Sequence, residues 1–385
     1  MTFLGSYTVV LLTVNAGLGD SSRLITIPVR LLMSLSCLII IIHNLNRRSV
    51  SLFWFMLFVG IYLTRIAFDY ITGAYFYISY IELLFYFMSF CVLPFLATSK
   101  VNLRKISFAK LYNVFLISAF AFSVLSVWMY SKYIGDVGRL SASRVDEDVV
   151  SPLILSYCST LAIGGVSSYL AFNKTSIRVM LASLLVLILS LIPFFLGASR
   201  GSILALLVPL LFIMFRNISF KSIFKYSFYF VLIVSILLYL DTYLQSGLFN
   251  RFLGTAEAIE TGGSSAGRLD IWKYSFSQFL DYPLLGDKLN TNVINHFPHN
   301  IYIEVLQTVG FIGFVPFLVL ILKGLSVCSR IFKYHRAYSW LAVLFIQSMI
   351  RHTFSSALYT SVWFWTSLAL ILSLNVYLSK YETST

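Results

Sequence analysis

The chain alternates between long apolar stretches and short polar segments over most of its length. A helix needs about 20 apolar residues to cross the hydrocarbon core of a bilayer, and roughly twelve stretches approach this length. They are expected at 2–19, 24–44, 51–72, 78–97, 109–130, 151–172, 177–197, 201–215, 224–240, 300–322, 338–351 and 356–378. Because two of these stretches are short, a count of about ten or eleven spans remains an alternative. The pattern predicts an all-α, polytopic integral membrane protein.

No repeat and no soluble-type segment interrupts this pattern, so residues 1–385 are taken as a single transmembrane domain. The stretch at 2–19 lacks a basic start and a small-residue cleavage site, which favours a first span over a cleavable signal. Two polar segments, a smaller one at 131–150 and a larger one at 241–299, exceed simple connectors. Loops of this length are usually functional or disordered.

The larger polar segment contains a helical pattern. Its apolar residues recur at helical spacing and are Leu269, Trp272, Phe276 and Phe279. This spacing predicts a short amphipathic helix over 268–280, lying on the membrane surface. Pro283 and Gly286 follow it and are expected to end it. The Gly- and Ser-rich stretch before it, 261–267, is expected to be a flexible hinge.

Composition agrees with a membrane protein. Hydrophobic residues make up 59% of the chain, charged residues make up 11%, and the mean hydropathy is +0.86. A water-soluble domain carries about a quarter charged residues, so the composition excludes that class. The net charge of +13 raises nucleic acid as a partner, but the basic residues lie in short clusters between apolar stretches, which indicates membrane orientation instead. The cysteines show no CxxC pairing and predict neither a disulfide framework nor a zinc site.

Charge predicts the orientation. Alternate loops are basic and contain no Asp or Glu, and their cations are Arg47, Arg48, Lys100, Arg104, Lys105, Lys110, Lys174, Arg178, Arg216, Lys221, Lys225, Lys323, Arg330, Lys333 and Arg336. By the positive-inside rule these loops are cytoplasmic, and so are both termini. Almost all acids, and both long polar segments, then fall on the other side.

Several arginines depart from this rule because they lie on the non-cytoplasmic side. They are Arg139, Arg144, Arg200, Arg268 and Arg351. A guanidinium group keeps its charge and offers a planar fork of donors that suits phosphate oxygens. These arginines are therefore candidates to bind a lipid pyrophosphate near the outer leaflet. The alternative is that they extend to the interface or pair with acids, which is open for Arg139 and Arg144 beside the acids at 146–148. For Arg65, one turn before Asp69, the ion pair is favoured.

A second candidate cluster lies where the larger polar segment returns to the membrane, in His296-Phe-Pro-His299-Asn300-Ile-Tyr-Ile-Glu304. Pro298 suits the first turn of a helix and Asn300 is a candidate cap. A histidine near a helix N-terminus is shifted toward its neutral form, which can accept a proton from a sugar hydroxyl. Glu304, about one turn later, is placed to orient His299 or contact an acceptor. The alternative is that His299 only caps the helix or satisfies a loop carbonyl.

Other chemistries find no support. The two histidines of this cluster lack a third ligand, so no metal site is expected. The sequence has no phosphate-cradling Gly-rich loop of the ATPase type and no Gly-x-Ser-x-Gly motif, and no cofactor is expected. A transferase outside the cytoplasm needs a substrate that carries its own activation, as a lipid pyrophosphate does.

The late part of the chain, about residues 190–325, resembles the O-antigen polymerase and O-antigen ligase family. The resemblance rests on the order and sidedness of four motifs, which are Ser199-Arg200-Gly201, Arg268 with Trp272, Pro283 with Gly286, and His299-Asn300 with Gly310 and Gly313. It implies a metal-independent glycosyltransferase that uses undecaprenyl-pyrophosphate-linked glycan at the periplasmic face of a bacterial inner membrane. Arg200 and Arg268 match arginines assigned to the donor pyrophosphate, and His299 matches the histidine proposed to activate the acceptor hydroxyl. Arg139, Arg351 and Glu304 are added from sidedness and spacing.

The resemblance leaves two related activities open. A polymerase moves the growing glycan onto a lipid-linked repeat unit, whereas a ligase moves the finished glycan onto lipid A–core. The compact chain with Glu304 inside the His-Asn helix favours the polymerase. The expected partners are the lipid-linked oligosaccharide, membrane lipids and a chain-length regulator, without nucleic acid. A flippase would need more charge within the spans, where Glu82 is the main candidate. A peptidoglycan polymerase relative and an accessory membrane protein are further alternatives.

Overall fold

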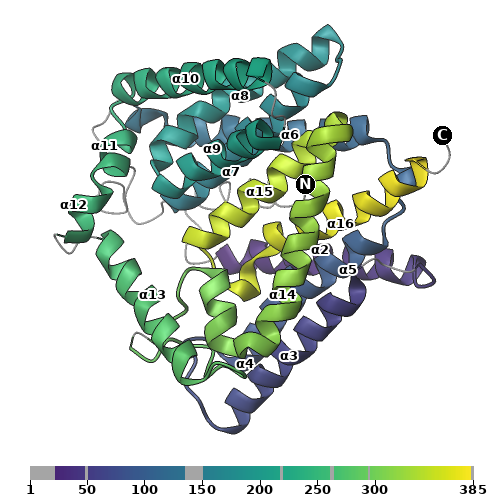
Figure 1. Cartoon of the computed structure of the whole chain (residues 1–385), viewed down its shortest axis with the longest axis vertical. Coiled ribbons are helices and arrows are strands. Elements are labelled where there is room, and N and C mark those ends of the chain that lie inside the picture. The colour runs from purple at the N-terminus through teal and green to yellow at the C-terminus, as the bar shows by residue number, and fades with distance from the viewer. Residues whose placement is uncertain are drawn as a thin grey trace. The chain divides into compact units, whose positions relative to one another are not determined.

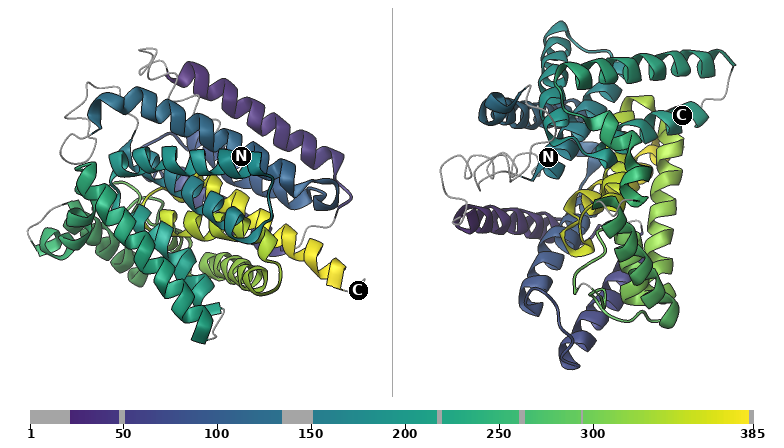
Figure 2. Two further views of the ribbon diagram at one scale, coloured as in Figure 1. Left: turned by 90° about the horizontal axis from the view of Figure 1, so that it is seen from above. Right: turned by 90° about the vertical axis from the view of Figure 1, so that its left-hand side faces the viewer.

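The computed structural model describes residues 22–47, 51–134, 151–216, 220–260, 264–293 and 295–382. All regular secondary structure in these ranges is helical (Figures 1 and 2), which confirms the all-α prediction. The chain divides into two compact units. Unit 1 lies within Met1–Leu32, Lys105–Gly254 and Cys328–Ile350, and unit 2 lies within Met33–Arg104, Thr255–Val327 and Arg351–Thr385.

Within the described ranges, 8 helical segments are long and apolar enough to cross a membrane. They lie in α2 (Ser22–His43), α3 (Leu52–Ile71), the continuous run of α4 (Tyr80–Phe87), a π-helical turn (Met88–Val92) and α5 (Leu93–Lys100), α6 (Phe108–Tyr130), α7 (Pro152–Phe172), α8 (Ile177–Gly197), α14 (Ile301–Tyr334) and α16 (Val362–Glu382). Shorter apolar stretches lie in α9 (Arg200–Arg216) and α10 (Phe220–Tyr243). The protein is therefore polytopic, whereas the count of about twelve stays a prediction. The span expected at 2–19 lies outside the described residues.

The remaining described α-helices belong to the late part of the chain and are α11 (Leu248–Leu253), α12 (Thr255–Glu260), α13 (Ser264–Asp281) and α15 (Ser339–Phe354). Two expectations are corrected here. The stretch 264–267, expected to be part of a hinge, is the first turn of α13, while 261–263 lies outside the described residues. The helix expected to end at 322 continues to Tyr334.

In unit 1, small residues allow close packing of α7 against its neighbours. Gly164 lies against the side chain of Gln347, whose Nε2 donates to the Thr160 carbonyl at 2.9 Å, so an added Cβ would overlap it. Hydroxyl pairs join α6 to α8, as between Ser123 and Ser190 at 2.8 Å. Helices in lipid associate through such close approach and polar contacts, because lipid tails are as apolar as the side chains.

The turn between α8 and α9 is tight. Ala198 adopts the left-handed conformation with φ of 36°, which ends α8, and Arg200 then begins α9. Ser156 donates to the Ser202 hydroxyl at 2.6 Å, and Ser202 donates to the Ser199 carbonyl at 2.6 Å. These bonds tie the turn to α7 and fix where the Arg200 backbone lies.

In unit 2, aromatic rings fill the space between helices. Phe55 stacks on Phe95 at 3.7 Å between centroids, while Phe58 contacts Phe317 at 5.4 Å and Trp365 at 5.5 Å. Stacked and edge-on rings stabilise a core beyond their area alone. The core therefore joins α3, α5, α14 and α16 within one unit.

The helix α14 is broken at Gly310, whose φ of 57° and ψ of −161° are open to glycine but not to other residues. The break frees two N–H groups, and Phe311 N donates to the Pro283 carbonyl at 2.8 Å while Ile312 N donates to the Leu284 carbonyl at 3.1 Å. Gly286 lies so close to the backbone of Thr308 that any Cβ would overlap it. The motif glycines thus let the turn after α13 dock directly against α14.

We expect Gly310→Ala to destabilise unit 2 by about 1–3 kcal/mol, because alanine at this backbone angle is strained and its Cβ would overlap Leu284. Thermal unfolding of the purified protein in detergent measures the effect. Gly60→Ala is the matched control, since nothing lies within 4 Å of a Cβ at that position. Equal melting temperatures for the two variants would contradict the role of the break.

Candidate functional site

The candidate site in unit 2 begins with α13, which contacts the segment before α14 and the end of α15. Arg268 donates from Nη1 to the Phe354 carbonyl at 3.1 Å. Trp272, one turn later, donates from Nε1 to the Pro298 carbonyl at 2.9 Å, and its ring lies 6.2 Å from that of Phe354. The predicted motif of Arg268 with Trp272 therefore lies beside the predicted His299-Asn300 motif.

His299 occupies a constrained backbone position. Its φ is 57°, in the left-handed region that histidine tolerates better than most residues. The next residue, Asn300, caps α14, since its Oδ1 accepts from Tyr302 N at 3.0 Å and from Ile303 N at 3.2 Å. This confirms the predicted cap. Pro298, by contrast, precedes the cap instead of occupying the first helical turn, because α14 begins at Ile301.

The surroundings of His299 keep its imidazole neutral. Burial, the neighbouring His296 and the positive charge of Arg268 lower the pKa of His299 to about 4. Burial disfavours the charged form of a base, and nearby positive charges add to that effect. His299 is consequently neutral at pH 7 and able to accept a proton.

Aromatic rings line the neighbourhood of this histidine. Phe297 lies 4.4 Å from the His299 ring, and His296 lies 5.3 Å from it and stacks on Tyr77 at 4.5 Å. Tyr359 approaches Phe297 edge-on at 6.2 Å. Sequence reasoning missed Tyr77 and Tyr359, since neither stands near a motif and only the fold brings them here.

Glu304 is buried, with 2% of its surface exposed, and its carboxylate binds a backbone N–H group. Its Oε2 accepts from Leu358 N at 2.9 Å, while the Leu358 carbonyl accepts from the Cys91 thiol at 3.2 Å. Among the described residues, no hydrogen bond joins Glu304 to His299. Glu304 thus fixes the backbone at Leu358, in the segment that follows α15. The carbonyl that accepts from Arg268 belongs to Phe354, the last residue of α15.

The other predicted arginines are distributed as follows. Arg351, in α15, places its guanidinium 3.7 Å from the centroid of the Trp363 ring, a cation–π contact. Arg200 begins α9 in unit 1. Arg139 and Arg144 lie outside the described residues. The predicted pair of Arg65 and Asp69 is confirmed at 3.3 Å, and Asp69 also accepts from Leu289 N at 3.0 Å.

Unit 1 adds an arginine that sequence reasoning missed. Arg251, in α11, donates from Nη1 to the Ala198 carbonyl at 3.2 Å, at the turn that precedes Arg200. Burial and the nearby charge of Arg200 lower the pKa of Arg251. The signal was present in the sequence, because Arg251 is also a cation in the larger polar segment, 241–299, which is predicted to be non-cytoplasmic.

The helix α13 confirms the predicted helix, but its apolar residues face two ways. Phe279 is buried against Phe311 at 5.1 Å between ring centroids, whereas Phe276 and Leu280 are exposed. The polar residues Ser275 and Gln278 bind the loop before α14. The helix is thus attached to protein along one face, while its contact with a membrane surface stays a prediction.

Comparison with known families identifies the late part of the chain. Residues 185–318 match the model of a family described as O-antigen ligase, and this range contains Arg200, Arg251, Arg268, His299 and Glu304. No curated protein matches the chain. Among the described residues, no group of three or more His, Cys, Asp or Glu side chains is arranged to hold a metal ion. The chain is thus a multi-pass membrane protein whose residues 185–318 are similar to the family described as O-antigen ligase.

Proposed function

We propose that this protein is an O-antigen polymerase, which transfers a growing glycan from undecaprenyl pyrophosphate onto the terminal sugar of a lipid-linked repeat unit. The observation that carries the proposal is the approach of Arg268 to a neutral His299 within the matched domain. The guanidinium group of Arg268 suits a phosphate leaving group, and the imidazole of His299 suits an acceptor hydroxyl. The reaction takes place at the periplasmic face of the inner membrane, with both termini in the cytoplasm, and uses no metal or cofactor.

The arginines bind the donor. Arg200 and Arg268 each contact the pyrophosphate, with Arg351 and Arg139 as further contacts. As the bond between the anomeric carbon and the phosphate oxygen breaks, negative charge grows on the pyrophosphate. Fixed guanidinium groups stabilise this charge more strongly than they stabilise the bound substrate, so they accelerate the reaction.

His299 serves the acceptor. Its neutral imidazole takes the proton of the sugar hydroxyl as that oxygen attacks the anomeric carbon, and undecaprenyl pyrophosphate leaves. Glu304 holds the backbone at Leu358, four residues after the Phe354 carbonyl that accepts from Arg268, and it lies one turn from Asn300 on the acceptor side. The rings of Tyr77 and Phe297 offer flat apolar faces to the sugar, and α13 forms the rim that holds the glycan.

A ligase is the second candidate, favoured by the family description itself. The two activities use the same donor and differ in the acceptor. The polymerase is preferred because the modest length of the chain and Glu304 within the first turn of α14 resemble that branch. A flippase is the more distant alternative.

A lipopolysaccharide gel from a strain lacking the chain tests the proposal. Core that carries a single repeat unit, without a ladder, is expected, and expression of the wild-type chain restores the ladder. Bare core with long glycan on the lipid carrier would identify a ligase instead. An unchanged ladder would exclude both activities.

A further inference from the structure

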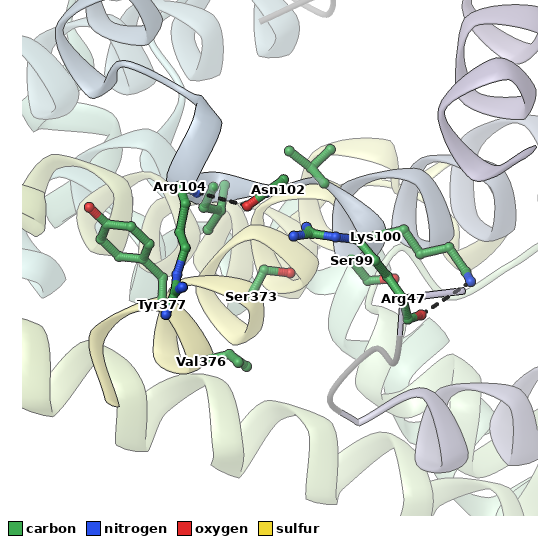
Figure 3. A pocket seen from close by; sticks show the side chains of 10 residues that line it. Arg47, Ser99, Lys100, Asn102, Arg104, Ser373, Val376 and Tyr377 are labelled. Carbon is green, nitrogen blue, oxygen red and sulfur yellow. Dashed lines mark hydrogen bonds between the residues drawn. The ribbon is translucent and has the colours of Figure 1, made fainter. Parts of the chain in front are cut away.

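A separate pocket of about 290 Å³ lies in unit 2, where α5 ends and the last turns of α16 pass by. Its polar lining includes Arg47, Lys100, Asn102, Arg104, Ser373 and the Tyr377 hydroxyl. Figure 3 shows Arg104 beside Tyr377 on one side and Arg47 on the other. None of the residues proposed for glycan transfer lines it.

Backbone contacts fix both arginines in place. Lys100 donates from Nζ to the Leu45 carbonyl at 2.9 Å and to the Arg47 carbonyl at 3.4 Å, which holds the chain after α2 at the pocket. Asn102 accepts from Arg104 N at 3.2 Å through its side-chain oxygen. The lysine charge is thus engaged by carbonyls, while the two guanidinium groups are presented to the pocket.

These guanidinium groups lack a negative partner within the part of the chain that the structure describes. Neither Arg47 nor Arg104 forms a side-chain hydrogen bond or an ion pair there, and no carboxylate lines the pocket. Orientation accounts for cations at this end of the spans. The positive-inside rule does not require these cations to enclose a cavity. The neighbouring Lys105 and Lys110, for example, do not line the pocket.

We propose that this pocket binds a phosphate group, in the form of an anionic phospholipid headgroup. Two candidate spans end beside it, Tyr80–Lys100 and Val362–Ser379, so the pocket lies at the depth where headgroups lie. Guanidinium groups bind phosphate oxygens through paired hydrogen bonds, and basic pockets at the cytoplasmic ends of spans recognise anionic lipids. Val376, with the ring of Tyr377, gives the pocket an apolar side, which suits a headgroup that continues into acyl chains.

The test measures thermal unfolding of the full chain in detergent during titration with phosphatidylglycerol, phosphatidylcholine or inorganic phosphate. The pocket variant carries Arg47→Gln with Arg104→Gln, and the matched control, which removes the same charge, carries Lys105→Gln with Lys110→Gln. We expect saturable stabilisation of wild type and control by phosphatidylglycerol. The pocket variant should bind about tenfold more weakly or worse.

Each outcome decides the proposal. Saturable stabilisation by inorganic phosphate at similar concentration, lost in the pocket variant, would support the phosphate site and assign it to a soluble ligand. Equal responses of wild type and pocket variant to phosphatidylglycerol would overturn it. So would equal weakening in the control variant, which would reduce the effect to general charge, or the absence of any stabilisation.

Discussion

Arg268→Ala is expected to reduce glycan transfer by about 10²–10³-fold, the range found when a single donor to a developing negative charge is removed. Arg268 lies in the first half of α13, its Nη1 donates to the Phe354 carbonyl, and its positive charge helps to lower the pKa of His299. Arg268→Lys should restore little, since an ammonium group keeps the charge but loses the planar fork. The measurement is the rate of glycan transfer by purified protein with lipid-linked repeat units.

Lys273→Ala is the matched control, because Lys273 lies on the same helix, is exposed and pairs with the exposed Asp270 at 3.7 Å. It should leave the rate unchanged. Full activity of the lysine variant would contradict the paired-bond role, and full activity of the alanine variant would remove Arg268 from the pyrophosphate altogether.

Arginine variants in unit 1 provide a second, independent test of pyrophosphate binding. Arg200→Ala should lower the rate as strongly as Arg268→Ala, and Arg251→Gln should lower it less, because Arg251 braces the turn before Arg200. If Arg200 and Arg268 contact one pyrophosphate, the double variant will lose less than the product of the single losses. Independent losses would mean that the two arginines serve different groups.

Hydropathy and charge were sufficient to predict the helical class and most helix positions, since a span must be apolar over its whole length. They could not predict the break at Gly310. That break depends on the docking of the turn at Pro283, a contact between segments that hydropathy along the chain does not encode. The glycines of the sequence motifs, Gly286 and Gly310, indicated special backbone positions, and the packing of the turn against α14 shows why glycine is needed.

The residues of the candidate site likewise include some that the sequence predicts and some that only the fold brings together. His299, Arg268 and Trp272 could be predicted because motif order and sidedness indicated them, and the structure brings them together. Tyr77 comes from a different part of the chain, and its stacking on His296 depends on tertiary packing alone. Glu304 shows the limit of spacing arguments: one turn along the helix suggested a bond to His299, yet the carboxylate binds Leu358 N.

His299→Ala is expected to lower transfer by about 10²–10⁴-fold at pH 7.5, because the attacking hydroxyl loses its proton acceptor. The wild-type pH profile provides a sharper signature. With its pKa lowered to about 4, His299 stays neutral down to mildly acidic pH, so the rate should decline only as pH falls through about 4. If His299 had the ordinary histidine pKa, it would be protonated as pH falls through about 6.5, and the rate of transfer would decline there.

The neighbour His296 supplies the discriminating variant. The proximity of His296 lowers the pKa of His299, so His296→Gln should raise the pKa of His299 and move the acid limb of the profile to higher pH. Activity at pH 7.5 should change little, because the imidazole remains neutral there. A lowered histidine pKa also destabilises the fold as pH falls from about 6.5 to about 4, so circular dichroism should accompany each rate measurement. An acid limb near pH 6.5 in wild type, or an unmoved limb in His296→Gln with the fold intact, would mean that another group accepts the proton and that His299 only shapes the loop before α14.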